Sequence, residues 1–241
     1  MKIHLAALSQ TPYIECEKCI YALESFYYFE KWQAPYLKTW DFLLDSGAFT
    51  FMSTRKNVDL DIYLTKYIEF INEHNIEKFF ELDVDNVKGL HWVEQARARL
   101  ERETGKKCIP VWHKARGKEY FVDICREYDY VAVGGIVTGE IRKSDYKYFS
   151  ELIKIAHENK AKIHGLGLTN MQALHKYPFD SVDSTNWKSG GRFGQLHLFN
   201  NNTGEIKIHR KPNTRAKDYK EIDKFNFEQW CKFQKYAERY M

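Results

Sequence analysis

Three aspartates lie near the ends of separate apolar runs in this chain of 241 residues. Asp45 follows FLL, Asp83 lies within KFFELDV, and Asp183 lies within SVDST. A single aspartate in such a place often only caps the next helix. Three carboxylates at one site instead favour acid–base or covalent chemistry at a sugar carbon, where one attacks and another moves a proton. The third can read the N–H groups of a base, because a carboxylate only accepts hydrogen bonds.

Other polar residues and glycines stand in equivalent places along the chain. They are Ser46 beside Asp45, His113, the pair Gly134 and Gly135, and Gly165 with Gly167. Glycines at a strand end let the backbone approach a flat ligand and leave N–H groups free to bind it. The simpler interpretation is tight turns that lead into helices. The coincidence of several strand ends favours a site.

The elements that must position these residues follow from periodicity. Short apolar runs predict strands at 2–8, 41–47, 78–84, 108–113, 130–135, 161–167 and 181–185, and 20–29 reads as either a strand or a short helix. Helical spacing of apolar residues covers 60–71, 92–100, 149–156 and 171–174. The predicted caps are Asn57 or Asp59, Gly105, Ser144, and Thr169 or Asn170.

Alternating strands and helices predict parallel strands with helices outside. The number of units favours a single domain over 1–241, a (β/α)8 TIM-type barrel of irregular form. A doubly wound open sheet is the alternative. Residues 191–241 are expected to form a C-terminal extension: two strands around an Asn- and Gly-rich turn, then a helix with Phe227, Trp230 and Phe233.

The composition is that of an ordinary globular protein, with 44% hydrophobic residues and a net charge of +4. No signal peptide or membrane segment is visible, and the five scattered cysteines favour reduced thiols, so we expect a cytoplasmic protein. Cys16 and Cys19 form a lone CxxC without a second ligand pair, so we expect neither a metal nor another cofactor.

In this order along the chain, the motifs resemble those of the tRNA-guanine transglycosylase family of β/α-barrel enzymes. LLDSGAFTF is similar to the family's DSGG(F/Y), ELDVDNV to its base-recognition strand, and VAVGGIVTGE to GGLxVGE. KIHGLG is similar to MGVG, and FDSVDST to VDxFDC. The matches cover residues 41 to 192 or so, and Ala48 replaces one family glycine.

The resemblance implies roles for these residues. Asp183 would attack C1′ of a nucleoside, expel guanine and form a covalent glycosyl-aspartate, and Asp45 would act as general acid and base. Asp83 would bind the N1 and 2-amino edge of the base. The remaining base-binding residues would be Ser46, His113 in place of the family's glutamine, Gly134, Gly135, Ile136, Val137, Gly165 and Gly167, with Glu140 near the 7-substituent.

The resemblance also favours DNA over tRNA as the nucleic-acid substrate. The tRNA enzymes carry a C-terminal zinc site of three Cys and one His, whereas Cys231 is the only cysteine of this sequence after Cys125. It resembles the compact phage-type enzymes that insert a 7-deazaguanine into DNA, which implies DNA and a free 7-deazaguanine base as partners, in the host cytoplasm if the gene is a phage's. A small zinc-free tRNA enzyme and a non-catalytic nucleic-acid-binding accessory barrel are the alternatives. A homodimer or an accessory protein for DNA loading is left open.

Basic residues near the C-terminus are candidates for phosphate contacts, although a solvated basic surface is an equal reading. The predicted nucleic-acid-binding residues are Lys188, Arg192, Lys207, Arg210, Lys211 and Arg215. A guanosine in duplex DNA would have to be extruded to reach Asp183, and Trp187 or a tyrosine could stack in its place.

Two aspartates compete for the role of nucleophile in the stretch FDSVDSTNW. Pro178 should end the preceding helix near Tyr177, so that the strand starts at Ser181. Asp183 then lies toward the carboxyl end of the strand, and Asp180 lies at its entry. We therefore predict Asp183 as the nucleophile and Asp180 as a structural residue.

Overall fold

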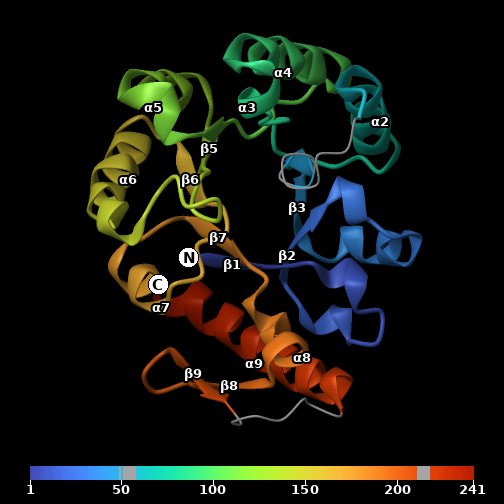
Figure 1. Ribbon diagram of the computed structural model, residues 1–241, viewed down its shortest axis with the longest axis vertical. Coiled ribbons are helices and arrows are strands. Elements are labelled where there is room, and N and C mark those ends of the chain that lie inside the picture. The colour runs from blue at the N-terminus through green and yellow to red at the C-terminus, as the bar shows by residue number, and fades with distance from the viewer. Residues whose placement is uncertain (49, 51–57, 211–217) are drawn as a thin grey trace.

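The computed structural model describes residues 1–48, 50, 58–210 and 218–241, with only the backbone described for Gly191, Arg192 and Arg210. Its main feature is a curled parallel sheet in the order β3-β2-β1-β7-β6-β5-β4, with helices along its outer side (Figure 1). The strands are β1 (Lys2–Ala6), β2 (Tyr21–Ser25), β3 (Asp41–Asp45), β4 (Val111–Trp112), β5 (Tyr130–Val133), β6 (Lys162–Gly165) and β7 (Ser181–Ser184). The strands predicted from the apolar runs at 2–8, 41–47, 108–113, 130–135, 161–167 and 181–185 are therefore confirmed, each over a shorter range.

The strand predicted over 78–84 is wrong in extent. Only two isolated bridges form there, Leu44 with Phe79 and Phe80 with Ile109, and they connect the edge strand β3 to the residues that precede β4. The ladder stops at Glu81, whose Oε1 accepts a hydrogen bond from the Val111 N–H at 3.0 Å. A side chain thus takes the donor that a neighbouring strand carbonyl would otherwise use.

The ambiguous segment 20–29 contains both elements that the sequence allowed. Strand β2 ends at Ser25, and a 3-10 helix follows directly over Phe26–Tyr28. Because β2 pairs with both β1 and β3, its carboxyl end joins the same edge of the sheet as the ends of its neighbours.

The helices on the outer side begin and end largely where their caps predict. They are α2 (Leu60–Glu73), α3 (Asp85–Lys88), α4 (Leu90–Thr104), α5 (Gly117–Glu127), α6 (Phe149–Glu158) and α7 (Met171–Lys176). The Asp59 side chain caps α2, Asn170 caps α7, and Gly105 ends α4 at a φ of 68°. Ser144 does not cap α6, because a 3-10 helix over Lys143–Tyr148 precedes it. No helix within the described ranges is long and apolar enough to cross a membrane.

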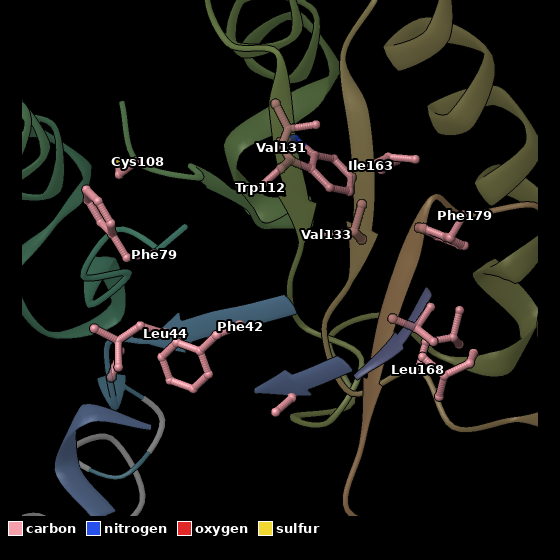
Figure 2. Packing of buried hydrophobic residues seen from close by; sticks show 14 of the residues in the cluster. Phe42, Leu44, Phe79, Cys108, Trp112, Val131, Val133, Ile163, Leu168 and Phe179 are labelled. Carbon is pink, nitrogen blue, oxygen red and sulfur yellow. The ribbon is translucent and has the colours of Figure 1, made fainter. Parts of the chain in front are cut away.

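The alternation of side chains along the strands produces two apolar layers. The outer layer packs between sheet and helices, and Figure 2 shows part of it, including Phe42 and Leu44 on β3 and Val131 and Val133 on β5. The inner layer is smaller and fills the concave side of the sheet. Its buried members are Ala6, Leu23, Leu43, Phe80, Ile109, Val111 and Ala132.

The C-terminal segment consists of α8 (Ser189–Phe193), the antiparallel hairpin β8 (Gln195–Asn200) and β9 (Glu205–Arg210), and α9 (Tyr219–Tyr240), which confirms the predicted hairpin and terminal helix. Helix α9 lies between β1 and the hairpin (Figure 1). Gln234 of α9 donates hydrogen bonds to the backbone oxygens of Ile3 (2.8 Å) and Tyr21 (2.7 Å). The last helix therefore packs directly on the main sheet.

Two isoleucines of α2 provide a test of this packing. Ile68 is 4% exposed in the outer layer, whereas Ile62 is 56% exposed on the same helix. We expect Ile68→Ala to lower the free energy of unfolding by about 2–5 kcal/mol, because it leaves a cavity. Ile62→Ala should change it by no more than about 0.5 kcal/mol. Urea unfolding measures both values, and equal losses would contradict the assignment of α2's buried face.

Candidate active site

One cavity of about 910 Å³ opens at the carboxyl ends of the parallel strands. Side chains or backbone from every strand of the main sheet, or from the residue just after it, reach its wall, as does the segment that follows the two bridges. Most of the residues predicted for chemistry or base binding line it: Asp45, Asp83, His113, Gly134, Gly135, Ile136, Val137, Gly167 and Asp183. Parallel pairing brings these ends together, because all the strands point toward the same edge.

Asp45, the last residue of β3, is held in an environment that favours its protonated form. Burial raises the pKa of its carboxyl to about 7, and the negative charges of Asp83 and Asp183 add to the rise. Its Oδ2 accepts the N–H of Gly47 at 3.0 Å. Gly47 has a φ of +84°, and a Cβ there would lie 2.9 Å from the Tyr63 hydroxyl, so this turn requires glycine. Asp45 can therefore give or take a proton near neutral pH.

Among the described residues, the hydrogen-bond partners of Asp183 contact only one of its two carboxylate oxygens. Its Oδ1 accepts the backbone N–H of Gly167 at 2.6 Å and a hydrogen bond from His164 Nε2 at 3.3 Å. Asp183 lies on β7, is 8% exposed as a residue, and lines the cavity. Such a carboxylate has a fixed orientation and a second oxygen with which it can attack a carbon atom.

His113 lies between two carboxylates. Its Nε2 donates to Asp83 Oδ2 at 3.1 Å and its Nδ1 to Glu140 Oε2 at 3.0 Å, which requires the doubly protonated ring. Burial opposes this charge, but the hydrogen bonds and charges of the two carboxylates outweigh it and raise the pKa of His113 to about 9. The imidazolium therefore offsets part of the negative charge that the aspartates bring to the cavity.

The glycine pair after β5 makes room for protein side chains. A Cβ on Gly134 would lie 2.8 Å from His113 Cε1, and one on Gly135 would lie 2.7 Å from Glu140 Oε2. Gly135 also has a φ of +82°. The sequence predicted space for a flat ligand at this point, and the structure places His113 and Glu140 there.

A buried ion-pair network supports the segment that carries Asp83. The Arg116 guanidinium donates to Glu81 Oε1 at 2.8 Å and to Asp85 Oδ2 at 2.9 Å. Arg116 and Glu81 are almost fully buried, and Arg97 approaches the other oxygen of Glu81 at 3.4 Å. Breaking such a network leaves a buried charge without compensation, so it holds the backbone on both sides of Asp83 firmly.

Sequence reasoning missed two buried polar residues at the strand ends. Glu24 on β2 lines the cavity, and its Oε2 accepts hydrogen bonds from Ser9 N–H (2.7 Å) and Gln33 Nε2 (3.0 Å). Glu24 was missed because residues 20–29 were not assigned to a strand, and polar residues were considered only at the ends of predicted strands. His164 on β6 directly precedes Gly165, and the prediction considered the glycines and not the histidine. Only the alternation of His164 with Leu166 along the strand could have indicated that His164 points inward.

Four predicted residues do not line the cavity: Ser46, Glu140, Gly165 and Trp187. Ser46 is fully buried and does not line the cavity, and a Cβ on Gly165 would meet Leu168 and Phe179 on the helix-facing side. Trp187 is not available to stack on a base: it is fully buried, donates from Nε1 to the Ala6 oxygen at 2.9 Å and packs on Phe227. An indole with an internal acceptor and an aromatic neighbour is a core residue.

The two aspartates considered as nucleophile lie near opposite ends of β7. Asp180 precedes the strand, and its Oδ2 accepts hydrogen bonds from Ile163 N–H (2.8 Å) and His157 Nε2 (3.0 Å). It is absent from the cavity wall, which Asp183 lines. The predicted register is confirmed, and Asp180 ties β7 to β6 and α6.

The predicted nucleic-acid contacts divide into three groups. Lys188 is buried and donates to Gln10, a residue of the cavity wall, at 2.5 Å, so its ammonium does not lie on an open surface. Lys207 is exposed on β9. The side chains of Arg192 and Arg210, and the whole of Lys211 and Arg215, lie outside the described residues.

The two cysteines of the CxxC sequence lie in the interior. Cys16 and Cys19 are both buried with free thiols, and burial raises the pKa of Cys16 to about 12. Over residues 1–48, 50, 58–210 and 218–241, no group of three or more His, Cys, Asp or Glu side chains is placed to hold a metal ion.

A scan against models of known protein families matches none of them, and a search of curated proteins returns no match. A functional assignment therefore depends on the chemistry of the cavity. That chemistry combines a carboxyl that titrates near neutral pH, an anchored carboxylate, and a third carboxylate paired with an imidazolium.

The two ends of β3 offer a matched pair of carboxyls. Burial of Asp41 is outweighed by ion pairs with Lys2 and Lys78, both at 2.5 Å, so the pKa of Asp41 is lowered whereas that of Asp45 is raised. We expect carboxyl ¹³C NMR titration, assigned with Asp45→Asn and Asp41→Asn, to find Asp45 near pH 7 and Asp41 below its usual range.

The same shifts predict opposite effects on stability. The folded pKa of Asp45 exceeds the unfolded value of about 3.9, so its contribution is full below about pH 4 and is lost as the pH rises through 7. At pH 8, Asp45→Asn should therefore raise the urea midpoint of unfolding, and Asp41→Asn should lower it. A lowered midpoint for Asp45→Asn at pH 8 would contradict this electrostatic assignment.

Proposed function

We propose that the protein is a transglycosylase that exchanges guanine in DNA for a free 7-deazaguanine base through a covalent glycosyl-aspartate. The observation that carries the proposal is the pairing of Asp45 and Asp183 in one cavity. Asp45 has a pKa of about 7, and Asp183 is anchored by one oxygen. A retaining exchange at a glycosidic carbon needs both a nucleophilic carboxylate and a carboxyl that carries a proton.

The proposed exchange proceeds in two steps. Asp183 Oδ2 attacks C1′ as the bond from C1′ to guanine breaks, and protonated Asp45 supplies the proton that leaves with guanine. The ionised Asp45 then takes the N9 proton of the incoming 7-deazaguanine, whose N9 attacks C1′ and releases Asp183. Each step leaves Asp45 in the state that the next step requires, and a pKa of about 7 makes both states accessible.

Base recognition is assigned to the opposite side of the cavity. Asp83 keeps its Oδ1 for the N1 and 2-amino edge of guanine while Oδ2 accepts from His113. Both ring N–H groups of His113 already donate to Asp83 and Glu140, so His113 would hold Asp83 in place, and the backbone of Gly135 and Ile136 would contact the base. Glu140 does not line the cavity, and its two oxygens accept from His113 and from the Ala115 N–H at 2.9 Å, so it would contribute near the 7-substituent by holding His113.

The proposal includes closure of the main sheet into a barrel. We interpret the two bridges at 79–80 and 109 as an eighth strand, reduced in length, that closes the curled sheet into an irregular (β/α)8 barrel. The resemblance of the motifs from Asp45 to Asp183 supports a transglycosylase, and the lack of the Cys and His set of the tRNA enzymes favours DNA.

Base exchange tests the proposal directly. Incubation with radiolabelled guanine or a labelled 7-deazaguanine should incorporate label into DNA, single- or double-stranded, and not into bulk tRNA. Label in tRNA alone would establish the tRNA alternative. No incorporation into either nucleic acid would overturn the proposed activity and favour the non-catalytic accessory barrel.

The two aspartates around β7 provide a matched pair for the nucleophile. We expect Asp183→Asn to reduce exchange by at least about 10³-fold, because it removes the attacking group. It should also lose the covalent protein–DNA adduct seen on a denaturing gel. Asp180→Asn, which lies outside the cavity, should keep both exchange and adduct. A full loss with Asp180→Asn and not with Asp183→Asn would reverse the assignment.

A further inference from the structure

A chain of hydrogen bonds runs through the inner side of the sheet to the anchored oxygen of Asp183. His164 on β6 is fully buried, and its Nε2 lies 3.3 Å from Asp183 Oδ1. Its Nδ1 lies 2.5 Å from Ser181 Oγ, which is also in contact with the Tyr130 hydroxyl. Neighbouring parallel strands supply these three partners, since His164 pairs with Ala132 on one side and with Ser181 on the other.

The partners give this chain one favoured direction. If the Tyr130 hydroxyl donates to Ser181, Ser181 can donate to Nδ1, and Nε2–H then donates to the carboxylate. Every hydroxyl and ring hydrogen in the chain thereby has an acceptor. In the opposite direction the hydrogen of Tyr130 would have no acceptor among the described residues. A neutral imidazole with its proton on Nε2 is the form that satisfies the whole chain.

The other groups around His164 do not compete for its nitrogens. Phe80 and His4 face the ring at centroid distances of 5.3 and 5.9 Å. Burial, together with His164 itself, holds the pKa of His4 well below its usual range, so His4 is neutral. The charged residues Lys2, Asp41 and Lys78 pair with one another at the amino end of the strands.

We propose that His164 is a positioning residue that orients the Asp183 carboxylate, with its tautomer set by Tyr130 and Ser181. Two donors, His164 Nε2–H and Gly167 N–H, hold Oδ1, so the carboxylate cannot rotate freely and Oδ2 is the oxygen presented to the cavity. The consequence for catalysis rests on the proposed role of Asp183 as the nucleophile, whereas the orientation of the carboxylate does not depend on that role.

His4 shows that burial alone does not produce such an arrangement. It lies on the neighbouring strand β1, at the position paired with Asp183, and is as buried as His164. Neither of its ring nitrogens has a hydrogen-bond partner in the described part of the chain. His4→Phe is therefore a matched control that changes the same interior without touching the hydrogen-bond chain.

The tautomer can be measured whatever reaction the protein catalyses. Long-range ¹H–¹⁵N correlation of the histidine rings, with His164 assigned by its loss in His164→Gln, should show Nε2 protonated and Nδ1 unprotonated at pH 7. Ser181→Ala should remove the preference for this tautomer, and His4→Phe should keep it. A wild-type ring that is protonated at Nδ1, or at both nitrogens, would overturn the proposal.

Kinetics test the consequence. His164→Leu should lower kcat for base exchange by about 10- to 100-fold, the effect of one hydrogen bond to a charged group, with KM for base and DNA nearly unchanged. His164→Gln, which keeps a donor near the position of Nε2, should recover part of the loss. Tyr130→Phe preserves the fold most closely and should give a smaller decrease in the same direction.

Unchanged kcat in both His164 variants, with folding verified by thermal unfolding, would overturn the positioning role. If wild-type protein exchanges no base, the proposed function fails. The ring-nitrogen measurement then still decides whether His164 orients Asp183.

Discussion

The burial of several carboxylates in one cavity, together with the repulsion between them, is the constraint on which the rest of the site depends. Parallel strands bring Asp45, Asp83 and Asp183 to one cavity, where water is partly excluded and like charges interact strongly. Each aspartate is stabilised in this environment in a different way. Asp83 pairs with an imidazolium, Asp183 accepts a backbone N–H, and Asp45 keeps a proton up to neutral pH. These three solutions give the aspartates three different chemical characters.

The supporting structure maintains these differences. The buried network of Arg116, Glu81 and Asp85 secures the segment around Asp83, next to His113. Gly134 and Gly135 leave the volume that His113 and Glu140 occupy, so a side chain at either position would displace the imidazolium. Loss of that cation would increase the negative potential at Asp45 and change the proton affinity on which its proposed role depends.

Much of the fold was predictable because local signals and tertiary structure agree. Short apolar runs, Pro178 and the caps Asp59, Gly105 and Asn170 located most strands and helices and indicated that Asp183, and not Asp180, lies toward the carboxyl end of its strand. The prediction was wrong where a side chain replaced a backbone partner, as Glu81 does for the strand expected over 78–84. The prediction was also wrong for Trp187 and Lys188, which were expected to contact nucleic acid and are instead buried with hydrogen-bond partners inside the protein.

The sequence by itself determined that Asp45 and Asp183 lie on parallel strands toward their carboxyl ends, because local patterns of apolar residues, proline and glycine indicate those strands. Only the tertiary structure decided what each carboxylate does there. The pKa of Asp45, the charge on His113 and the oxygen by which Asp183 is held all arise from burial and from contacts between residues of different elements. Electrostatic energies depend on distance and burial, and neither quantity is encoded in local sequence patterns.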